Sequence, residues 1–146
     1  MTSTASSVPA FVFPLARLLL AAMFVQSGFD KLTHLDATAA FIAAGGLPLA
    51  PVMAPLVGAF ELLAGLAVVV GWQARTAGLL LALFTLVASF LFHRYWAVHA
   101  EQAFTQQLLF MKNVAVAGGM LLLFAAGPGA LSLRVRGGVE SRAAGD

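Results

Sequence analysis

The sequence predicts an all-α protein: a four-helix transmembrane bundle with a short interfacial helix between the first and second crossings. Of its 146 residues, 61% are hydrophobic and only 10% are charged, whereas soluble domains carry roughly 25% charged residues. The mean hydropathy is +0.95. Four apolar stretches approach the roughly 20 residues that a helix needs to cross hydrocarbon. Each is expected to be helical, because isolated strands cannot satisfy their backbone inside a bilayer.

The four predicted crossings cover residues 11–29, 50–70, 76–92 and 104–126. Gly71 ends the second crossing, so the second and third are expected to form a tight hairpin. The run Gly127-Pro128-Gly129 ends the fourth crossing, because glycine and proline interrupt helices.

These crossings belong to a single membrane domain, residues 11–133, with little sequence left for a soluble domain. Residues 1–10 are rich in Ser, Thr and Ala and are predicted to be disordered. They lack the basic stretch of a signal peptide, and no convincing cleavage site follows the first apolar stretch. We therefore interpret the first crossing as a retained helix rather than a signal peptide. Residues 134–146 are rich in Gly and Ala, which is typical of a flexible tail.

The two long connections between crossings differ in character. Residues 33–49 are apolar mainly through alanine and are broken by a Gly-Gly-Leu-Pro run. Asp36 can cap a helix here, so we expect a short interfacial or re-entrant helix. Residues 93–101 include Tyr95 and Trp96, which fit the aromatic belt at a membrane surface and are predicted to anchor the chain there.

Basic residues near the helix ends predict the orientation. With four crossings, both termini share a side, and that side would hold Arg17, Arg75, Arg134 and Arg136. The opposite side would hold Lys31 and Arg94, so the positive-inside rule places both termini in the cytoplasm. Arg17 and Arg75 are expected to extend to the lipid headgroups and act as membrane anchors.

Lys112 and Asn113 lie inside the fourth crossing. A lysine near the bilayer centre costs roughly 3 kcal/mol even on the mildest insertion scale, so such a residue usually faces the bundle interior or a wet cavity. Glu61, in the second crossing, is the predicted partner of Lys112. Each of the two lies on a stripe of small residues at helical spacing, so we expect both charges to face inward.

Depth along the helices groups five candidate pocket residues in one half of the bundle: Lys31, Glu61, His93, Lys112 and Asn113. A protonatable glutamate beside a lysine or histidine can bind a polar headgroup, such as a quinone carbonyl, or relay a proton. The alternative is a structural ion pair that fixes the register of two helices. The residues alone leave both interpretations open.

Several kinds of site are disfavoured by the composition. The chain has no cysteine, so disulfides, thiol catalysis and cysteine-ligated metal centres are excluded. The spacing of the three histidines matches no tight metal motif, and we predict no metal site. The net charge of +2 is too small, and too scattered, to suggest nucleic-acid binding.

Four runs of residues are similar to a known family: Gly28-Phe29-Asp30-Lys31-Leu32, Phe92-His93-Arg94-Tyr95-Trp96, Phe110-Met111-Lys112-Asn113, and Gly127-Pro128-Gly129-Ala130-Leu131-Ser132. The chain resembles the DoxX family of small bacterial membrane proteins, whose Gly-x-x-Lys signature the first run matches. The resemblance extends over about residues 15–133. One departure is Arg134, which stands where the family usually has an acidic residue.

The resemblance implies a four-helix protein of the bacterial inner membrane. Family members and relatives have been associated with membrane-bound oxidoreductase complexes, quinone-linked thiosulfate oxidation, and defence against oxidative or quinone stress. By resemblance, this chain would be a quinone-interacting or accessory subunit, and a partner enzyme would carry the electrons. Whether the chain is itself an enzyme stays open.

Two other functions stay open. The chain could be a non-catalytic membrane scaffold that recruits a soluble enzyme, or a small-solute carrier, in which case four short helices would need to form a homo-oligomer. An apolar channel that reaches Lys112 favours the quinone interpretation. A tightly packed bundle favours the scaffold, and a water-filled path open to both faces favours the carrier.

Overall fold

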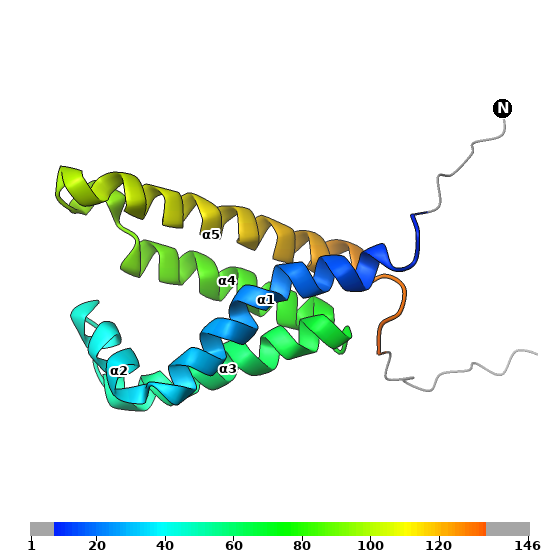
Figure 1. The fold of residues 1–146 in the computed structure, drawn as a ribbon, viewed down its shortest axis with the longest axis horizontal. Coiled ribbons are helices and arrows are strands. Elements are labelled where there is room, and N and C mark those ends of the chain that lie inside the picture. Colours follow the sequence, from blue (N-terminus) through cyan, green and yellow to red (C-terminus); the bar gives the residue numbers. More distant parts are fainter. Residues whose placement is uncertain (1–7, 134–146) are drawn as a thin grey trace, which may run out of the picture.

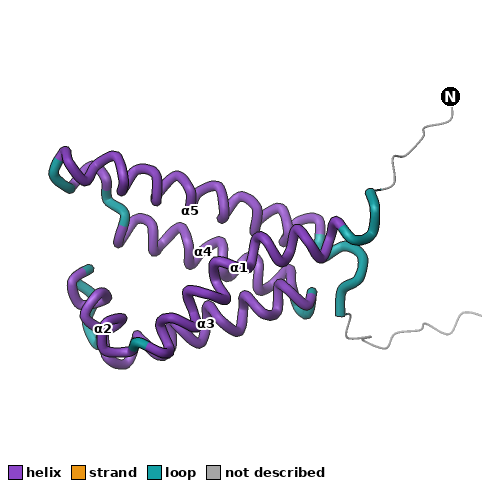
Figure 2. Tube along the Cα trace, in the orientation of Figure 1, coloured by secondary structure: helices purple, strands orange, loops and turns teal. Residues whose placement is uncertain are grey.

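The structure, a computed structural model, describes residues 8–133, and these residues form helices joined by short loops (Figures 1 and 2). Four helices are long and apolar enough to cross a membrane: α1 (Val12–Thr33), α3 (Ala50–Val70), α4 (Ala74–Phe92) and α5 (Ala100–Ala126). The short helix α2 (Leu35–Ala44) connects α1 to α3, and a single turn, η1 (Tyr95–Ala97), precedes α5. The predicted fold class is therefore confirmed.

Helix ends differ in detail from the predicted spans. α1 continues to Thr33 instead of ending at residue 29, and α5 begins at Ala100 rather than at residue 104. His34, not Asp36, is the N-cap residue of α2, and Asp36 lies in the first turn, where a carboxylate is favoured by the helix dipole. Of the predicted N-terminal segment, residues 1–7 lie outside the described residues, as does the whole predicted tail, 134–146.

The helices are arranged as two arms. α1 packs along α3 and α4 packs along α5, whereas α1 meets α5 over only a short stretch. The arms join at the end of the molecule where α1 begins and α5 ends, and they diverge toward the opposite end, where α2 packs on α3 (Figure 1). We call these the closed end and the open end.

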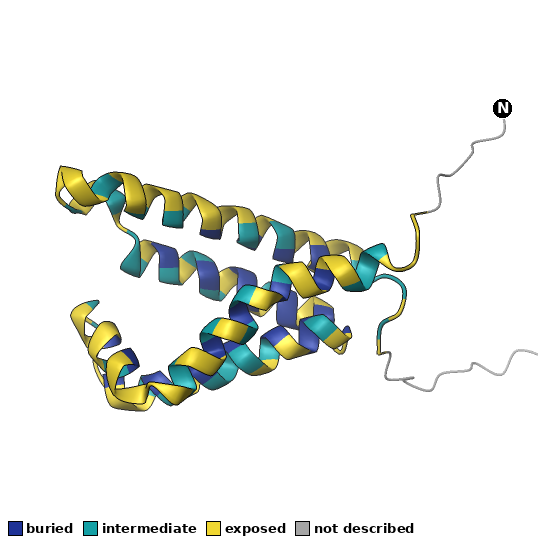
Figure 3. Cartoon of the chain, in the orientation of Figure 1, coloured by how far each residue is buried: buried dark blue, intermediate teal, exposed yellow. Residues whose placement is uncertain are grey.

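The closed end is filled by a core built mainly from small residues. Its buried members are Ala21, Phe24, Ala67, Val68, Ala74, Ala77, Leu81, Ala82, Ala117, Met120 and Leu123. Small residues let helix backbones approach closely, as membrane helices do. The outer faces of the helices are largely exposed (Figure 3) and carry large apolar side chains, as expected for a surface that lies against lipid tails.

α1 and α3 approach each other closely at Gly28. A Cβ atom at this position would lie 2.7 Å from the carbonyl oxygen of Gly58 and 2.8 Å from the Cα of Leu62. Only glycine fits, because both neighbours are backbone atoms that cannot rotate away. Lys31 lies one turn beyond Gly28 and Glu61 one turn beyond Gly58, so this contact brings the two charged residues together.

The structure corrects the prediction that Arg17 extends to the lipid headgroups as a membrane anchor. Arg17 is only 3% exposed. Nη1 donates a hydrogen bond to the carbonyl oxygen of Pro128 at 3.1 Å, and Nη2 donates to that of Leu131 at 2.7 Å. These carbonyls lie beyond the end of α5, where no helical N–H can reach them. The buried guanidinium satisfies them and fastens the segment after α5 to α1.

The other three predicted anchors lie nearer the surface. Arg75 is exposed, and its Nη2 donates to the carbonyl oxygen of Ala126 at 3.4 Å. Tyr95 and Trp96 form an aromatic group with Phe110, with ring centroids 4.9–5.7 Å apart. Their role as membrane anchors stays a prediction.

Candidate functional site

A cavity of about 480 Å³ lies between the two arms toward the open end, and helices α1 to α5 all contribute to its wall. This volume lies within the range of roughly 300–1,000 Å³ that is usual for small-molecule sites. The structure brings all five sequence-predicted pocket residues to this one cavity: Lys31, Glu61, His93, Lys112 and Asn113. Whether they bind a ligand stays a prediction.

Glu61 forms an ion pair with Lys31, with Nζ to Oε2 at 2.9 Å. The lysine also donates to the hydroxyl of Ser27, one turn earlier on α1. The prediction that Glu61 pairs with Lys112 is therefore wrong for the described residues. The reason is the arrangement of the arms. Glu61 lies on α3, which packs against α1 at Gly28, whereas Lys112 lies on α5 in the other arm.

The carboxylate of Glu61 is deeply placed, with its side chain only 6% exposed. The predicted stripe on α3 is confirmed, since Ala54, Gly58, Glu61 and Gly65 are all buried. A carboxylate can accept about four hydrogen bonds, and among the described residues only Lys31 donates to this one, at Oε2. Oε1 therefore retains capacity for a ligand or water in the cavity.

On α5 the inward face differs from the prediction by one residue. Asn113 is buried, together with Ala117 and Met120, whereas Lys112 is exposed. Lys112 thus lies at the edge of the cavity. At this edge the hydrocarbon stem of Lys112 can line an apolar wall while its ammonium group extends toward polar groups.

Thr85 and His93 complete the polar groups of the α4–α5 arm. Thr85 is 3% exposed, and its hydroxyl has no hydrogen-bond partner among the described residues. Such a group costs about 1–3 kcal/mol if it stays unsatisfied, and because its oxygen is covered, a ligand or water reaches it only when a neighbouring side chain moves. His93 follows the end of α4, and its Nδ1 lies 2.9 Å from Oε1 of Gln106.

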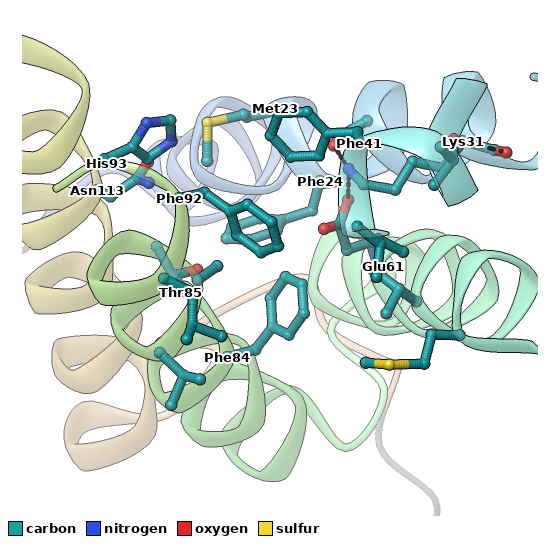
Figure 4. Close-up of a pocket in the computed structure, with 18 of the residues that line it drawn as sticks. Met23, Phe24, Lys31, Phe41, Glu61, Phe84, Thr85, Phe92, His93 and Asn113 are labelled. Carbon is teal, nitrogen blue, oxygen red and sulfur yellow. Dashed lines mark hydrogen bonds and ion pairs between the residues drawn. The ribbon is translucent and has the colours of Figure 1, made fainter. Parts of the chain in front are cut away.

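Aromatic rings separate the two polar sides of the cavity. Figure 4 shows Lys31 and Glu61 on one side, His93, Asn113 and Thr85 on the other, and the rings of Phe24, Phe84 and Phe92 between them. Phe92 also stacks on Phe41 of α2, with centroids 4.9 Å apart and planes at 22°. This stacked pair joins α2 to α4 beside the cavity.

Sequence reasoning missed Ser27, Thr38 and Thr85 as members of the cavity wall. Two of them carried a usable signal. Ser27 precedes Lys31 by one helical turn, which places both on one face. Thr85 is an isolated hydroxyl in an otherwise apolar crossing, where polar groups need a partner. The phenylalanines gave no such signal, because aromatic residues are common throughout apolar helices.

Comparisons with known proteins agree on one family. The sequence model of the DoxX family matches residues 13–94. The chain is 40% identical over 118 residues to inner membrane protein YqjF of Escherichia coli strain K12, covering 81% of this chain and 85% of that protein. It is 32% identical over 119 residues to inner membrane protein YphA of the same strain, covering 82% and 85%. No solved structure gives a significant match.

Proposed function

This chain belongs to the DoxX family, and from that premise we propose that it is an integral inner-membrane protein that binds a quinone-like molecule between its two arms. The observation that supports this most is the division of the cavity into two polar sides with aromatic rings between them (Figure 4). A quinone is a flat ring with carbonyl oxygens at opposite edges. It therefore needs hydrogen-bond donors at two ends and apolar walls over its faces.

Both ends offer donors. On the α1–α3 side, the ammonium group of Lys31 lies beside the buried Glu61, and a charge-assisted hydrogen bond from such a group is stronger than a neutral one. On the α4–α5 side, Asn113 can donate through its amide, and Thr85 can donate through its unpartnered hydroxyl once a neighbouring side chain moves aside. The aromatic rings between them suit offset stacking on a flat headgroup.

The cavity also extends to the outer surface of the bundle. Lys112 of α5 and Val87 of α4 line it, and both are exposed. Because lipid tails surround these helices, an apolar tail attached to the headgroup can leave the cavity sideways into the bilayer. With both termini in the cytoplasm, as the distribution of basic residues predicts, the open end would face the extracytoplasmic side.

The role we propose is that of an accessory subunit in a membrane redox or oxidative-stress detoxification system, in which a partner enzyme exchanges electrons with the bound quinone. The cavity favours this role over a scaffold, which would need no ligand space. The packed core at the closed end disfavours a carrier, because it fills the space between the arms that a path to the second membrane face would require.

The test is gentle purification from native membrane, followed by mass spectrometry of the extracted lipids. Wild type is expected to carry quinone, and Ala88→Phe, which places a ring inside the cavity, is expected to lose it. Ala115→Phe is the matched control, since Ala115 is exposed on α5 and does not line this cavity. Equal amounts of quinone in all three proteins, or none in wild type, would refute the proposal.

A further inference from the structure

A second cavity, of about 500 Å³, opens between α1 and α2 next to the first. We call it the α1–α2 groove. Its polar lining consists of Gln26, Ser27, Asp30, Lys31, His34 and Thr38. Such a lining would be costly against lipid tails. The rest of the lining is apolar, from Met23, Ala37 and Phe41. Water is expected beside the polar groups, because it finds several hydrogen-bonding partners there.

Lys31 belongs to both cavities, as do Met23, Ser27, Thr38 and Phe41, so the two spaces share one wall. Its side chain is 27% exposed, whereas that of its partner Glu61 is only 6% exposed. Glu61 lines the inner cavity but not the groove. Among the described residues, Lys31 alone both hydrogen-bonds to this carboxylate and lines the groove; its ammonium group lies 2.9 Å from Oε2 and also donates to Ser27.

The other charged or titratable groups around the pair lie on both sides of it. Asp30 and His34 line the groove, and both are exposed. His93 and Lys112 line the inner cavity from the α4–α5 arm. Titratable groups thus line the groove on one side of the ion pair and the inner cavity on the other. Lys31 lies between these two sets of groups.

We propose that the α1–α2 groove is a water-filled route by which protons reach Glu61, with Lys31 as the relay. In this transfer an N–H bond of the Lys31 ammonium breaks and an O–H bond forms at Oε2 of Glu61. Water in the groove, or protonated His34, then returns a proton to Nζ. The net change is one proton moved from bulk water to the carboxylate of Glu61, and no electron moves.

The purpose of such a route rests on the proposed function, because a quinone takes up protons when it is reduced by the partner enzyme. The route itself needs no ligand, so it can be tested separately. If no quinone binds but the groove conducts protons, the proposed function fails and this inference stands. If quinone binds but the groove is dry, the reverse holds.

Hydration is tested with single cysteines, since the natural chain has none. Gln26→Cys places a thiol in the groove, since Gln26 lines the groove but not the inner cavity. Phe29→Cys is the matched control: it lies at similar depth on α1, is also exposed, at 58%, and lines neither cavity. In lipid nanodiscs, a charged methanethiosulfonate reagent attacks only the thiolate form, which requires water, so Gln26→Cys is expected to react about tenfold faster or more. Equal rates, or a slower Gln26→Cys, would overturn the proposal.

Proton transfer is tested by infrared spectroscopy at acidic pH, with Glu61→Gln subtracted to identify the carboxyl band of Glu61. After a change from H₂O to D₂O, this band is expected to shift within the mixing time in unlabelled Gln26→Cys. It is expected to shift about tenfold more slowly once a bulky label fills the groove. Identical exchange with and without the label, or the absence of any protonated Glu61 at acidic pH, would contradict a route through the groove.

Discussion

The contact between α1 and α3 gives a sharp prediction for Gly28→Ala. The added methyl group would lie 2.7 Å from the carbonyl oxygen of Gly58, and its other near neighbours are backbone atoms of Leu62. Carbon atoms prefer separations of about 3.5–4.0 Å. The two helices must therefore move apart by about 1 Å, since no flexible side chain can give way. Gly118→Ala is the matched control, because a Cβ there meets nothing within 4 Å.

The two substitutions should change stability in opposite directions. Replacing glycine by alanine in a helix gains about 0.5–1 kcal/mol where space is free, so Gly118→Ala should be stabilising. At Gly28 the same gain is outweighed by overpacking, which costs about 1–3 kcal/mol. Because the clash is with backbone, we expect a net loss of about 1–2 kcal/mol.

The same displacement should affect the site. Lys31 Nζ and Glu61 Oε2 are 2.9 Å apart, and separating their helices by about 1 Å would take them beyond the 2.7–3.2 Å range of a good hydrogen bond. Gly28→Ala should therefore also weaken quinone binding, while Gly118→Ala should not. Unfolding is followed by circular dichroism in mixed micelles, as the fraction of denaturing detergent is raised. Equal stabilisation of both variants would refute the close contact and the placement of Lys31 that depends on it.

Three further predictions use the same unfolding assay. Thr85→Val removes the unpartnered hydroxyl, so it should leave stability unchanged or raise it by about 1 kcal/mol while weakening quinone binding; a large loss of stability would show that the hydroxyl has a partner. Arg17→Lys loses at least one of two hydrogen bonds from a buried cation and should lower the free energy of unfolding by about 1.5–3 kcal/mol. The matched control Arg75→Lys, at an exposed position, should change it by less than about 0.5 kcal/mol. Similar losses of stability in both variants would contradict the role of Arg17 in fastening the segment after α5. Lys31→Met should destabilise by about 3–5 kcal/mol because it leaves Glu61 unpaired, and adding Glu61→Leu should recover most of that loss; additive losses would mean that the two charges do not interact.

The helices could be predicted from sequence because the bilayer fixes their length and composition. Residues 50–70 coincide with α3, and Gly71 ends it with a positive φ of 78°, a conformation that glycine adopts without strain. The inward face of α3 was also predictable, since Glu61 lies on a stripe of small residues. Helical spacing on a single helix contains that information.

The ion pair could not be predicted, because it depends on which helices pack together. Lys31 was expected to lie just beyond the first crossing, which was predicted to end at residue 29. In the structure Gly28 instead packs directly against the backbone of α3, and the helix continues past Lys31. Arg17 illustrates the same limit: its partners are carbonyls more than a hundred residues away along the chain.

The central claim is that a quinone lies between the two polar sides of the cavity, and infrared spectroscopy of a bound short-chain quinone tests it most directly. With ¹³C placed at one carbonyl and then at the other, each stretching band should fall in frequency on binding, because each oxygen accepts a hydrogen bond. Glu61→Gln should then alter one band, and Asn113→Leu the other. Binding that leaves both carbonyl frequencies unchanged, or variants that both alter the same band, would contradict the account.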